Sequence, residues 1–172
     1  MKKLPASVLA LALAGTAGFT QADSIGGFYV GAKTGHMNFD VSGIRNDRGD
    51  GLFLGYEWLA GDQLGIAVEY EYTTTSADAR VSGLPGDVDL DTHALYAALR
   101  YGETVYFKAK AGILREEADI KVAGVKVSDN DTGFSGGVGA GYRFSPNFMV
   151  EVEYTIIEKD VDYLSIGAAF KF

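Results

Sequence analysis

Two pairs of carboxylates, Glu69 with Glu71 and Glu151 with Glu153, are the first candidates for chemistry in this sequence. Paired carboxyl groups hydrolyse glycosides when they flank the substrate, at a separation of about 5–5.5 Å in a retaining enzyme. Residues two apart on a strand lie side by side on one face instead. These pairs leave no room for a sugar between them, so the spacing does not favour a glycosidase.

The only two histidines, His36 and His93, are the next candidates. A membrane enzyme that modifies lipid A needs a histidine held beside a Ser or Asp partner. No Ser stands two residues from either histidine, although Asp91 shares the face of His93. We expect both histidines to lie at a membrane interface, with no catalytic residues. A lipid A-modifying enzyme is therefore the least favoured alternative.

Acidic residues gather in two polar stretches, at Asp87, Asp89 and Asp91 and at Asp129 and Asp131. Their spacing does not match an EF-hand loop, which places a bidentate Glu at its twelfth position. We expect solvated charge and neither a metal site nor a cofactor. Weak divalent bridging to anionic lipopolysaccharide is the alternative.

The overall composition excludes several function classes. The chain has 15 basic and 23 acidic residues, whereas a nucleic-acid-binding protein needs a basic face. It has no cysteine, which rules out disulfides, a thiol nucleophile and a thiolate metal site.

The N-terminus has the organisation of a secretory signal peptide. Lys2 and Lys3 precede an apolar run over residues 4–19, and Thr20-Gln21-Ala22 places small residues at a cleavage site. The run is short for a spanning helix, which needs about 20 residues. The sequence therefore predicts a signal peptide over residues 1–22 and a single domain over residues 23–172.

The rest of the chain repeats one pattern eight times: a stretch of alternating polarity followed by a polar connection. The predicted strands are residues 28–39, 51–58, 64–74, 89–101, 104–115, 132–144, 148–157 and 162–172. Three connections are long, at residues 40–50, 75–88 and 116–131, and they alternate with short ones. Short turns at one end and long loops at the other are typical of an outer-membrane barrel. The pattern predicts an all-β fold, an eight-stranded antiparallel up-and-down transmembrane β-barrel.

The two faces of these strands differ in chemistry. Val150, Val152 and Tyr154 share one face of their strand, while Glu151 and Glu153 share the other. A soluble, lipocalin-like barrel would turn its apolar face inward and is the main alternative. The polar face is rich in glycine, however, which suits a narrow interior, and Tyr and Phe gather towards strand ends as in the aromatic girdles of membrane barrels.

Three motifs resemble the OmpA/OmpX-type family of small outer-membrane barrels. They are the first strand at residues 28–35 (FYVGAKTG), residues 131–135 with the turn at Ser145-Pro146, and the C-terminal strand at residues 165–172 (SIGAAFKF). The resemblance implies that Ser165, Gly167, Phe170 and Phe172 form the C-terminal signal read by the barrel-assembly machinery. It also implies a monomer in contact with outer-membrane lipid and lipopolysaccharide, with both termini in the periplasm.

The resemblance also sets expectations about what this chain lacks. The sequence ends at Phe172, so we expect no peptidoglycan-binding domain, and a role as a cell-wall tether is disfavoured. The connection at residues 158–161 is short, so we expect no extended strands that protrude as a sheet edge.

The strand positions that alternate toward the interior of the barrel carry charged side chains of both signs. An interior only wide enough for side chains obliges these charges to pair or to stay hydrated. We expect a structural network of ion pairs, with Tyr29, Met37 and Tyr96 filling the remaining lumen. Its members are Lys33, Glu57, Glu69, Glu71, Arg100, Lys108, Lys110, Arg143, Glu151, Glu153 and Lys171.

Two function classes follow from this interpretation. The favoured one is a non-enzymatic surface protein that contributes to envelope integrity or contacts surfaces and hosts through acidic extracellular loops. The alternative is a small passive ion-leak channel.

Overall fold

The computed structural model describes residues 26–39, 47–60, 62–81, 84–122, 125–159 and 161–172. For residues 78–81, 84–87, 120–122 and 125–126 it describes the backbone alone. The predicted signal peptide, residues 1–22, lies outside the described residues and stays a prediction.

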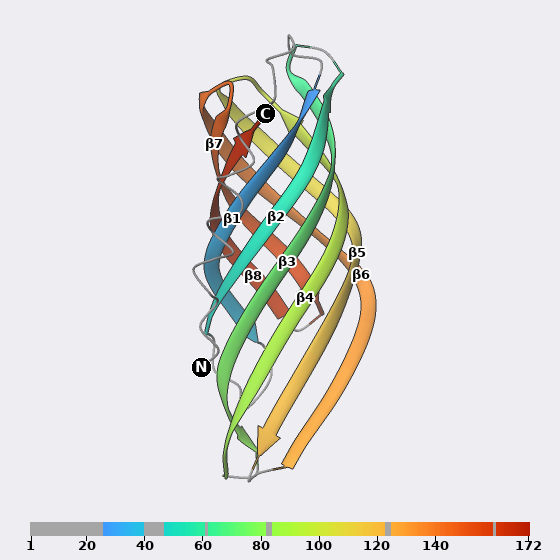
Figure 1. Cartoon of the computed structure of the whole chain (residues 1–172), viewed down its shortest axis with the longest axis vertical. Coiled ribbons are helices and arrows are strands. Elements are labelled where there is room, and N and C mark those ends of the chain that lie inside the picture. Colours follow the sequence, from blue (N-terminus) through green and yellow to red (C-terminus); the bar gives the residue numbers. More distant parts are fainter. Residues whose placement is uncertain (1–25, 40–46, 61, 82–83, 123–124, 160) are drawn as a thin grey trace.

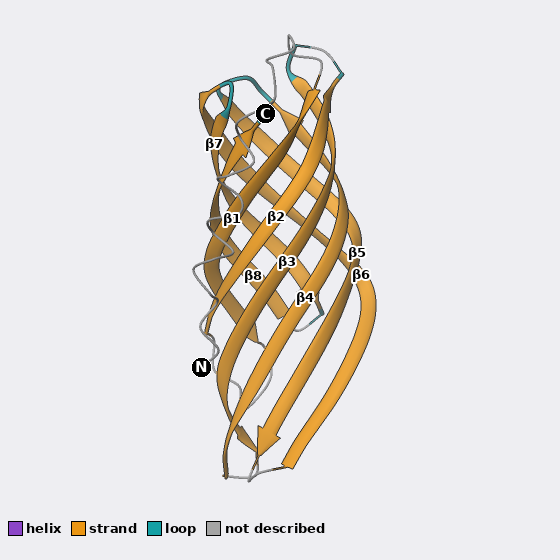
Figure 2. Ribbon diagram, viewed as in Figure 1, coloured by secondary structure: helices purple, strands orange, loops and turns teal. Residues whose placement is uncertain are grey.

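Eight strands form one closed barrel in which every strand pairs antiparallel with its sequence neighbours, and β1 closes the sheet against β8 (Figures 1 and 2). This confirms the predicted fold class. The strands are β1 (Gly26–Phe39), β2 (Asp47–Leu59), β3 (Leu64–Val81), β4 (Leu84–Tyr101), β5 (Val105–Val122), β6 (Val125–Ser145), β7 (Phe148–Glu158) and β8 (Val161–Lys171). In the described part of the chain, no helix has the length and apolarity needed to cross a membrane.

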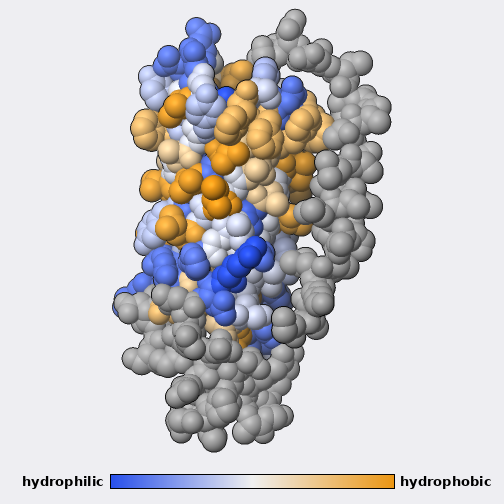
Figure 3. Space-filling model, turned by 90° about the vertical axis from the view of Figure 1, so that its left-hand side faces the viewer, coloured by the Kyte–Doolittle hydropathy of each residue, from blue (hydrophilic) through white to orange (hydrophobic). Residues whose placement is uncertain are grey.

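The strands turn their apolar side chains outward. Phe107 is 69% exposed and Phe134 is 91% exposed, whereas Glu69 and Arg100 are fully buried. Figure 3 shows the outward apolar side chains as a band on one face, nearer the end of the barrel that carries the short turns. A soluble barrel has the opposite arrangement, so the faces are those of a barrel surrounded by hydrocarbon.

Glycine on the inward face makes room for tyrosine rings. A Cβ added at Gly55 would lie 2.4 Å from Cζ of Tyr29, and one added at Gly141 would lie 2.3 Å from Cζ of Tyr106. Both distances are far below van der Waals contact. The interior of the barrel is therefore packed with side chains, and any larger residue at Gly55 or Gly141 would displace a tyrosine ring.

Two of the predicted long loops are wrong. β3 runs to Val81 and β4 starts at Leu84, while β5 runs to Val122 and β6 starts at Val125, so each connection has two residues. Beyond the apolar belt the outward face of the sheet meets water, so its outward side chains are polar and the alternation that marks a membrane strand is lost. The sequence pairs Ser82-Gly83 and Ala123-Gly124 also suit two-residue hairpins, in which glycine is favoured.

The extra length of β3–β6 forms a four-stranded extension, which we call the protruding sheet: residues 76–81, 84–92, 116–122 and 125–135. In Figure 1 it extends well past the ends of the other strands. Pairing of β2 with β3 stops at Gly49 and Thr75, and pairing of β6 with β7 starts at Gly136 and Ile156. The connection between β7 and β8 is short, as predicted, but the expectation that no strands protrude is wrong.

Candidate functional site

The centre of the lumen is a cluster of four buried charges from opposite walls. The Arg100 guanidinium on β4 lies 2.8 Å from Glu151 on β7 and 2.9 Å from Glu69 on β3. The Lys108 ammonium on β5 lies 2.7 Å from Glu69 and 3.1 Å from Glu151. Each carboxylate therefore contacts two cations.

A second layer lies on the side of the protruding sheet. Lys33 on β1 donates a hydrogen bond of 2.6 Å to Glu71, and Lys110 on β5 donates one of the same length to the other oxygen of Glu71. Lys110 also bonds Glu153, which lies 2.9 Å from Lys108. Lys108 thus joins the two layers into one network.

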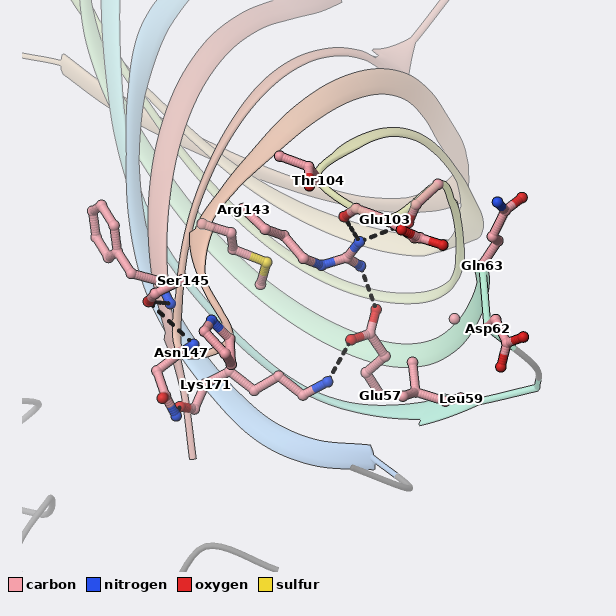
Figure 4. Close-up of a pocket in the computed structure, with 15 residues that line it drawn as sticks. Glu57, Leu59, Asp62, Gln63, Glu103, Thr104, Arg143, Ser145, Asn147 and Lys171 are labelled. Atoms are coloured by element: carbon pink, nitrogen blue, oxygen red, sulfur yellow. Dashed lines mark hydrogen bonds and ion pairs between the residues drawn. The ribbon is translucent and has the colours of Figure 1, made fainter. Parts of the chain in front are cut away.

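A third group of charges lines a pocket of about 420 Å³ at the short-turn end (Figure 4). Lys171 on β8 donates a 2.7 Å hydrogen bond to Glu57, whose second oxygen lies 3.6 Å from Arg143 and 3.7 Å from Arg100. Arg143 also donates to the backbone carbonyls of Gly102 and Glu103, which fixes it to the turn between β4 and β5. Glu57, Arg143 and Lys171 of this pocket are therefore engaged with one another or with the backbone.

An apolar group of buried side chains crosses the lumen on the other side of the ion pairs. It contains Met37, Leu90, Tyr96, Leu114 and Tyr163 from four different strands, and Ile157 of β7 packs with them. A cavity of about 10 Å³ remains among the charges, between Lys33 and Glu151, and this volume holds about one water. Between the pocket at the short-turn end and the protruding sheet, the described interior is thus filled by paired charges and apolar side chains.

Tyrosine hydroxyl groups complete the hydrogen bonds of the central carboxylates. Tyr29 donates to Glu69 at 2.7 Å, and Tyr106 donates to Glu151 at 2.8 Å. Sequence reasoning treated Tyr29 only as a filler and missed Tyr106. Tyr106 shares the parity of Lys108, so its inward direction was available from the sequence, but its partner on β7 was not.

The interior carboxylates do not form a vacant metal site. Glu69, Glu71 and Glu153 bring oxygens within 4.8 Å of one another, the one such group among the described residues. The ammonium groups of Lys33, Lys108 and Lys110 contact these carboxylates directly. The three lysine ammonium groups therefore already neutralise the carboxylates that a metal ion would need as ligands.

The remaining predicted residues lie on the outside of the barrel or at its C-terminal end. The Nδ1 atom of His93 is hydrogen-bonded to the Tyr70 hydroxyl at 2.7 Å, and Tyr72 donates to Asp91 at 2.9 Å. His36 is exposed. In the C-terminal motif the rings of Phe170 and Phe172 lie 5.3 Å apart. Ser165 is buried, and Gly167 lies against Lys33.

The protruding sheet gathers acidic side chains beyond the apolar belt. Burial raises the pKa of Glu116 to about 7, helped by the Glu158 carboxyl hydrogen-bonded to it and by the nearby Asp131 and Asp129. On β6, the backbone N–H of Asn130 donates to Asp129 at 2.9 Å, and that of Thr132 donates to Asp131 at 2.7 Å. Of the aspartates singled out in the sequence, Asp87 has no described side chain.

Comparison with known proteins connects this architecture to a family. The model of the outer membrane protein beta-barrel domain matches residues 6–172. A comparison with curated protein sequences found no match.

Several solved structures share the fold. They include Ail, the attachment invasion locus protein of Yersinia pestis, in complex with the heparin analogue sucrose octasulfate (20% identity, TM-score 0.58, covering 86% of this chain and 97% of Ail). Neisserial surface protein A is similar at 22% identity and a TM-score of 0.63, covering 84% of this chain and 97% of that one. A major outer membrane protein of Thermus thermophilus is similar at 15% identity and a TM-score of 0.62, covering 87% of this chain and 100% of that one. This chain therefore belongs to the outer membrane protein beta-barrel domain family and is a protein of the bacterial outer membrane.

Proposed function

We propose that this chain is a non-enzymatic surface protein that contacts molecules outside the cell through its protruding sheet. In this proposal the short-turn end, with both termini, faces the periplasm. The observation that carries it is the continuation of β3–β6 past the barrel: four strands leave the apolar belt as one paired sheet, with two-residue connections. Paired strands hold a fixed surface in place, which suits recognition better than a solvated loop.

The lumen acts in this proposal as a structural plug. Its eleven charged residues pair with one another, and the apolar group from Met37 to Tyr163 fills the section beyond them. An ion that crossed this section would have to displace buried ion pairs and pass apolar side chains without its hydration shell, which is costly. These contacts favour the plug over the passive leak.

The charge of the protruding sheet indicates which partners it suits. Ail binds a heparin analogue, a polyanion. Here the described side chains beyond the belt include Asp89, Asp91, Glu117 and Asp119, with Asp89 directly opposite Asp119 and Asp91 opposite Glu117. Like charges repel a polyanion. We therefore expect partners with basic surfaces and no binding of heparin-like sugars.

Biogenesis follows the expectation for the family. We propose that residues 1–22 are removed on export and that Ser165, Gly167, Phe170 and Phe172 on the last strand are read by the barrel-assembly machinery. The folded product is then a monomer in contact with outer-membrane lipid and lipopolysaccharide.

A trimmed barrel tests the proposed function. Replacing residues 74–91 and 117–130 each by an Asn-Gly turn joins Thr73 to Thr92 and Glu116 to Asp131, pairs that already lie opposite each other. The trim removes Asp89, Asp91, Glu117 and Asp119. Cells that display the trimmed and the full-length protein at equal density are compared for adhesion to host cells and to immobilised matrix proteins. The proposal expects adhesion with the full-length protein alone. Equal adhesion by both would refute it.

A further inference from the structure

We propose that the pocket at the short-turn end binds a short zwitterionic peptide, with its carboxylate beside Lys171 and Arg143 and its ammonium beside Glu103 and Asp62. Three features of the pocket carry this proposal: an excess positive charge at its floor, two carboxylates without partners at its rim, and an apolar wall. The pocket lies at the opposite end of the barrel from the protruding sheet, so this binding does not depend on the proposed function.

The side-chain charges of the described lumen balance except in this pocket. The central cluster and the second layer contain four cations and four carboxylates, which are Lys33, Arg100, Lys108 and Lys110 with Glu69, Glu71, Glu151 and Glu153. The pocket adds two cations, Lys171 and Arg143, but one buried carboxylate, Glu57. Enclosed charge is costly unless it is paired. The floor of the pocket therefore carries one excess positive charge, which suits an anionic group.

Lys171 and Arg143 also keep N–H donors for such a group. An ammonium has three N–H groups, and Lys171 uses one of them on Glu57 at 2.7 Å. Arg143 donates from Nη1 to the carbonyls of Gly102 and Glu103, while its Nη2 lies 3.6 Å from Glu57, too far for a good hydrogen bond. Both side chains are partly exposed, so their remaining donors are accessible from the pocket.

The rim of the pocket carries the opposite charge. Asp62 lies in the turn between β2 and β3, and Glu103 lies in the turn between β4 and β5. Both are exposed, and within the described part of the chain neither side chain forms an ion pair or a hydrogen bond. In Figure 4, Lys171 reaches the centre of the pocket from one side, whereas Glu103 and Asp62 lie on the other. A ligand with a carboxylate at the floor and an ammonium at the rim matches this separation of charge.

The volume and the apolar wall set the size of the ligand. The pocket, at about 420 Å³, is near the lower end of the range for small-molecule sites, about 300–1,000 Å³. Leu59, Pro146 and Met149 line it beside the charged groups and suit an aliphatic side chain. A polyanion such as a sugar phosphate would be repelled by Asp62 and Glu103. A dipeptide with one aliphatic residue, such as alanyl-leucine, meets all of these requirements.

Binding of alanyl-leucine to the barrel in lipid nanodiscs tests the site, because both ends of the barrel are open to solution there. Two further probes lack one charge each: the N-acetylated dipeptide has no ammonium, and the dipeptide amide has no carboxylate. Calorimetry measures the affinities, and NMR shifts of the amides locate the site. We expect alanyl-leucine to bind and to shift the amides of Gly65 and Gly102, and each blocked form to bind about tenfold more weakly. The proposal is overturned if alanyl-leucine does not bind at millimolar concentration, or if either blocked form binds as tightly.

Variants of the rim separate recognition of the ammonium from effects on folding. Glu103→Gln/Asp62→Asn changes only exposed groups, so the barrel should keep its stability. We expect this variant to weaken alanyl-leucine binding about tenfold and to leave binding of the acetylated dipeptide within about twofold, because that probe has no ammonium. Glu117→Gln removes an exposed carboxylate at the other end of the barrel and should change neither affinity. Equal effects of the rim variant on both probes would refute the proposal.

A variant of the floor tests the other half of the site. Lys171→Met removes the excess positive charge and leaves Glu57 paired with Arg143. We expect it to weaken alanyl-leucine binding about tenfold and to leave binding of the dipeptide amide within about twofold, because the amide has no carboxylate. Wild-type affinity of folded Lys171→Met for alanyl-leucine would contradict the proposal. If this variant does not fold, the rim variant still decides.

Discussion

Replacing Glu69 with glutamine measures how strongly the central ion pairs hold the barrel together. Glu69 is fully buried and accepts hydrogen bonds from Arg100, Lys108 and Tyr29. The glutamine keeps the shape of the side chain and removes its charge. Removing one partner of a buried ion pair lowers the free energy of unfolding by about 3–5 kcal/mol, because the other charge is left uncompensated. Arg100 and Lys108 keep Glu151, so we expect a loss near the lower end, about 3 kcal/mol.

The Arg48–Asp50 pair supplies a matched control. Its atoms lie 3.0 Å apart, almost the distance between Arg100 and Glu69, but both side chains are well exposed. Exposed pairs contribute about 0–1 kcal/mol, so Asp50→Asn should change stability by less than about 1 kcal/mol. A double variant, Glu69→Gln with Lys108→Met, removes one charge of each sign. It should be less destabilised than Glu69→Gln alone.

Unfolding in urea from lipid vesicles measures these differences, with the fluorescence of Trp58 as the probe. Trp58 is the only tryptophan and faces outward, so its emission reports its transfer from lipid to water. The reasoning is refuted if Glu69→Gln costs no more free energy of unfolding than Asp50→Asn. In that case the interior would be hydrated well enough to screen the charges.

Two further predictions concern packing and pH. Gly141→Ala should destabilise the barrel by about 1–3 kcal/mol, because the new Cβ would overlap the ring of Tyr106, whereas Gly133→Ala, with no atom within 4 Å of its Cβ, should be neutral in the same urea assay. Burial raises the pKa of Glu116 to about 7, so the folded state binds the proton of this carboxyl group more tightly than the unfolded state does. The stability of the barrel therefore falls as the pH rises from the ordinary pKa of a glutamate through about 7. Discounted for the exposure of Glu116, Glu116→Gln should gain about 1 kcal/mol relative to wild type between pH 4.5 and 8, and an equal pH dependence of both proteins would contradict this assignment.

The interior of the barrel was predictable from parity because a strand has a side-chain period of two. Once Glu69 is placed inside, Glu71 follows, and a shift by one residue would turn a whole apolar face inward. Which cation meets which carboxylate was not predictable. Those distances depend on the stagger between strands far apart in the sequence, such as β3 and β5.

The protruding sheet was missed for a different reason. Alternation of apolar and polar residues is strong only where the outward face meets lipid. In residues 116–119 and 128–132 the outward side chains are polar, and so are most of the inward ones. Their Asp, Glu, Asn and Ser side chains therefore resemble a loop in sequence, although each residue is paired with a neighbouring strand. Pairing between polar strands leaves little trace in the order of residues.

Single-channel recording in planar bilayers tests most directly the claim that the barrel is a closed scaffold and not a pore. The account predicts no conductance steps for the wild type. It predicts none for Lys108→Ala/Lys110→Ala either, because Met37, Tyr96 and Tyr163 still fill the lumen beyond the ion pairs. Reproducible ion steps from the folded wild-type protein would contradict the account.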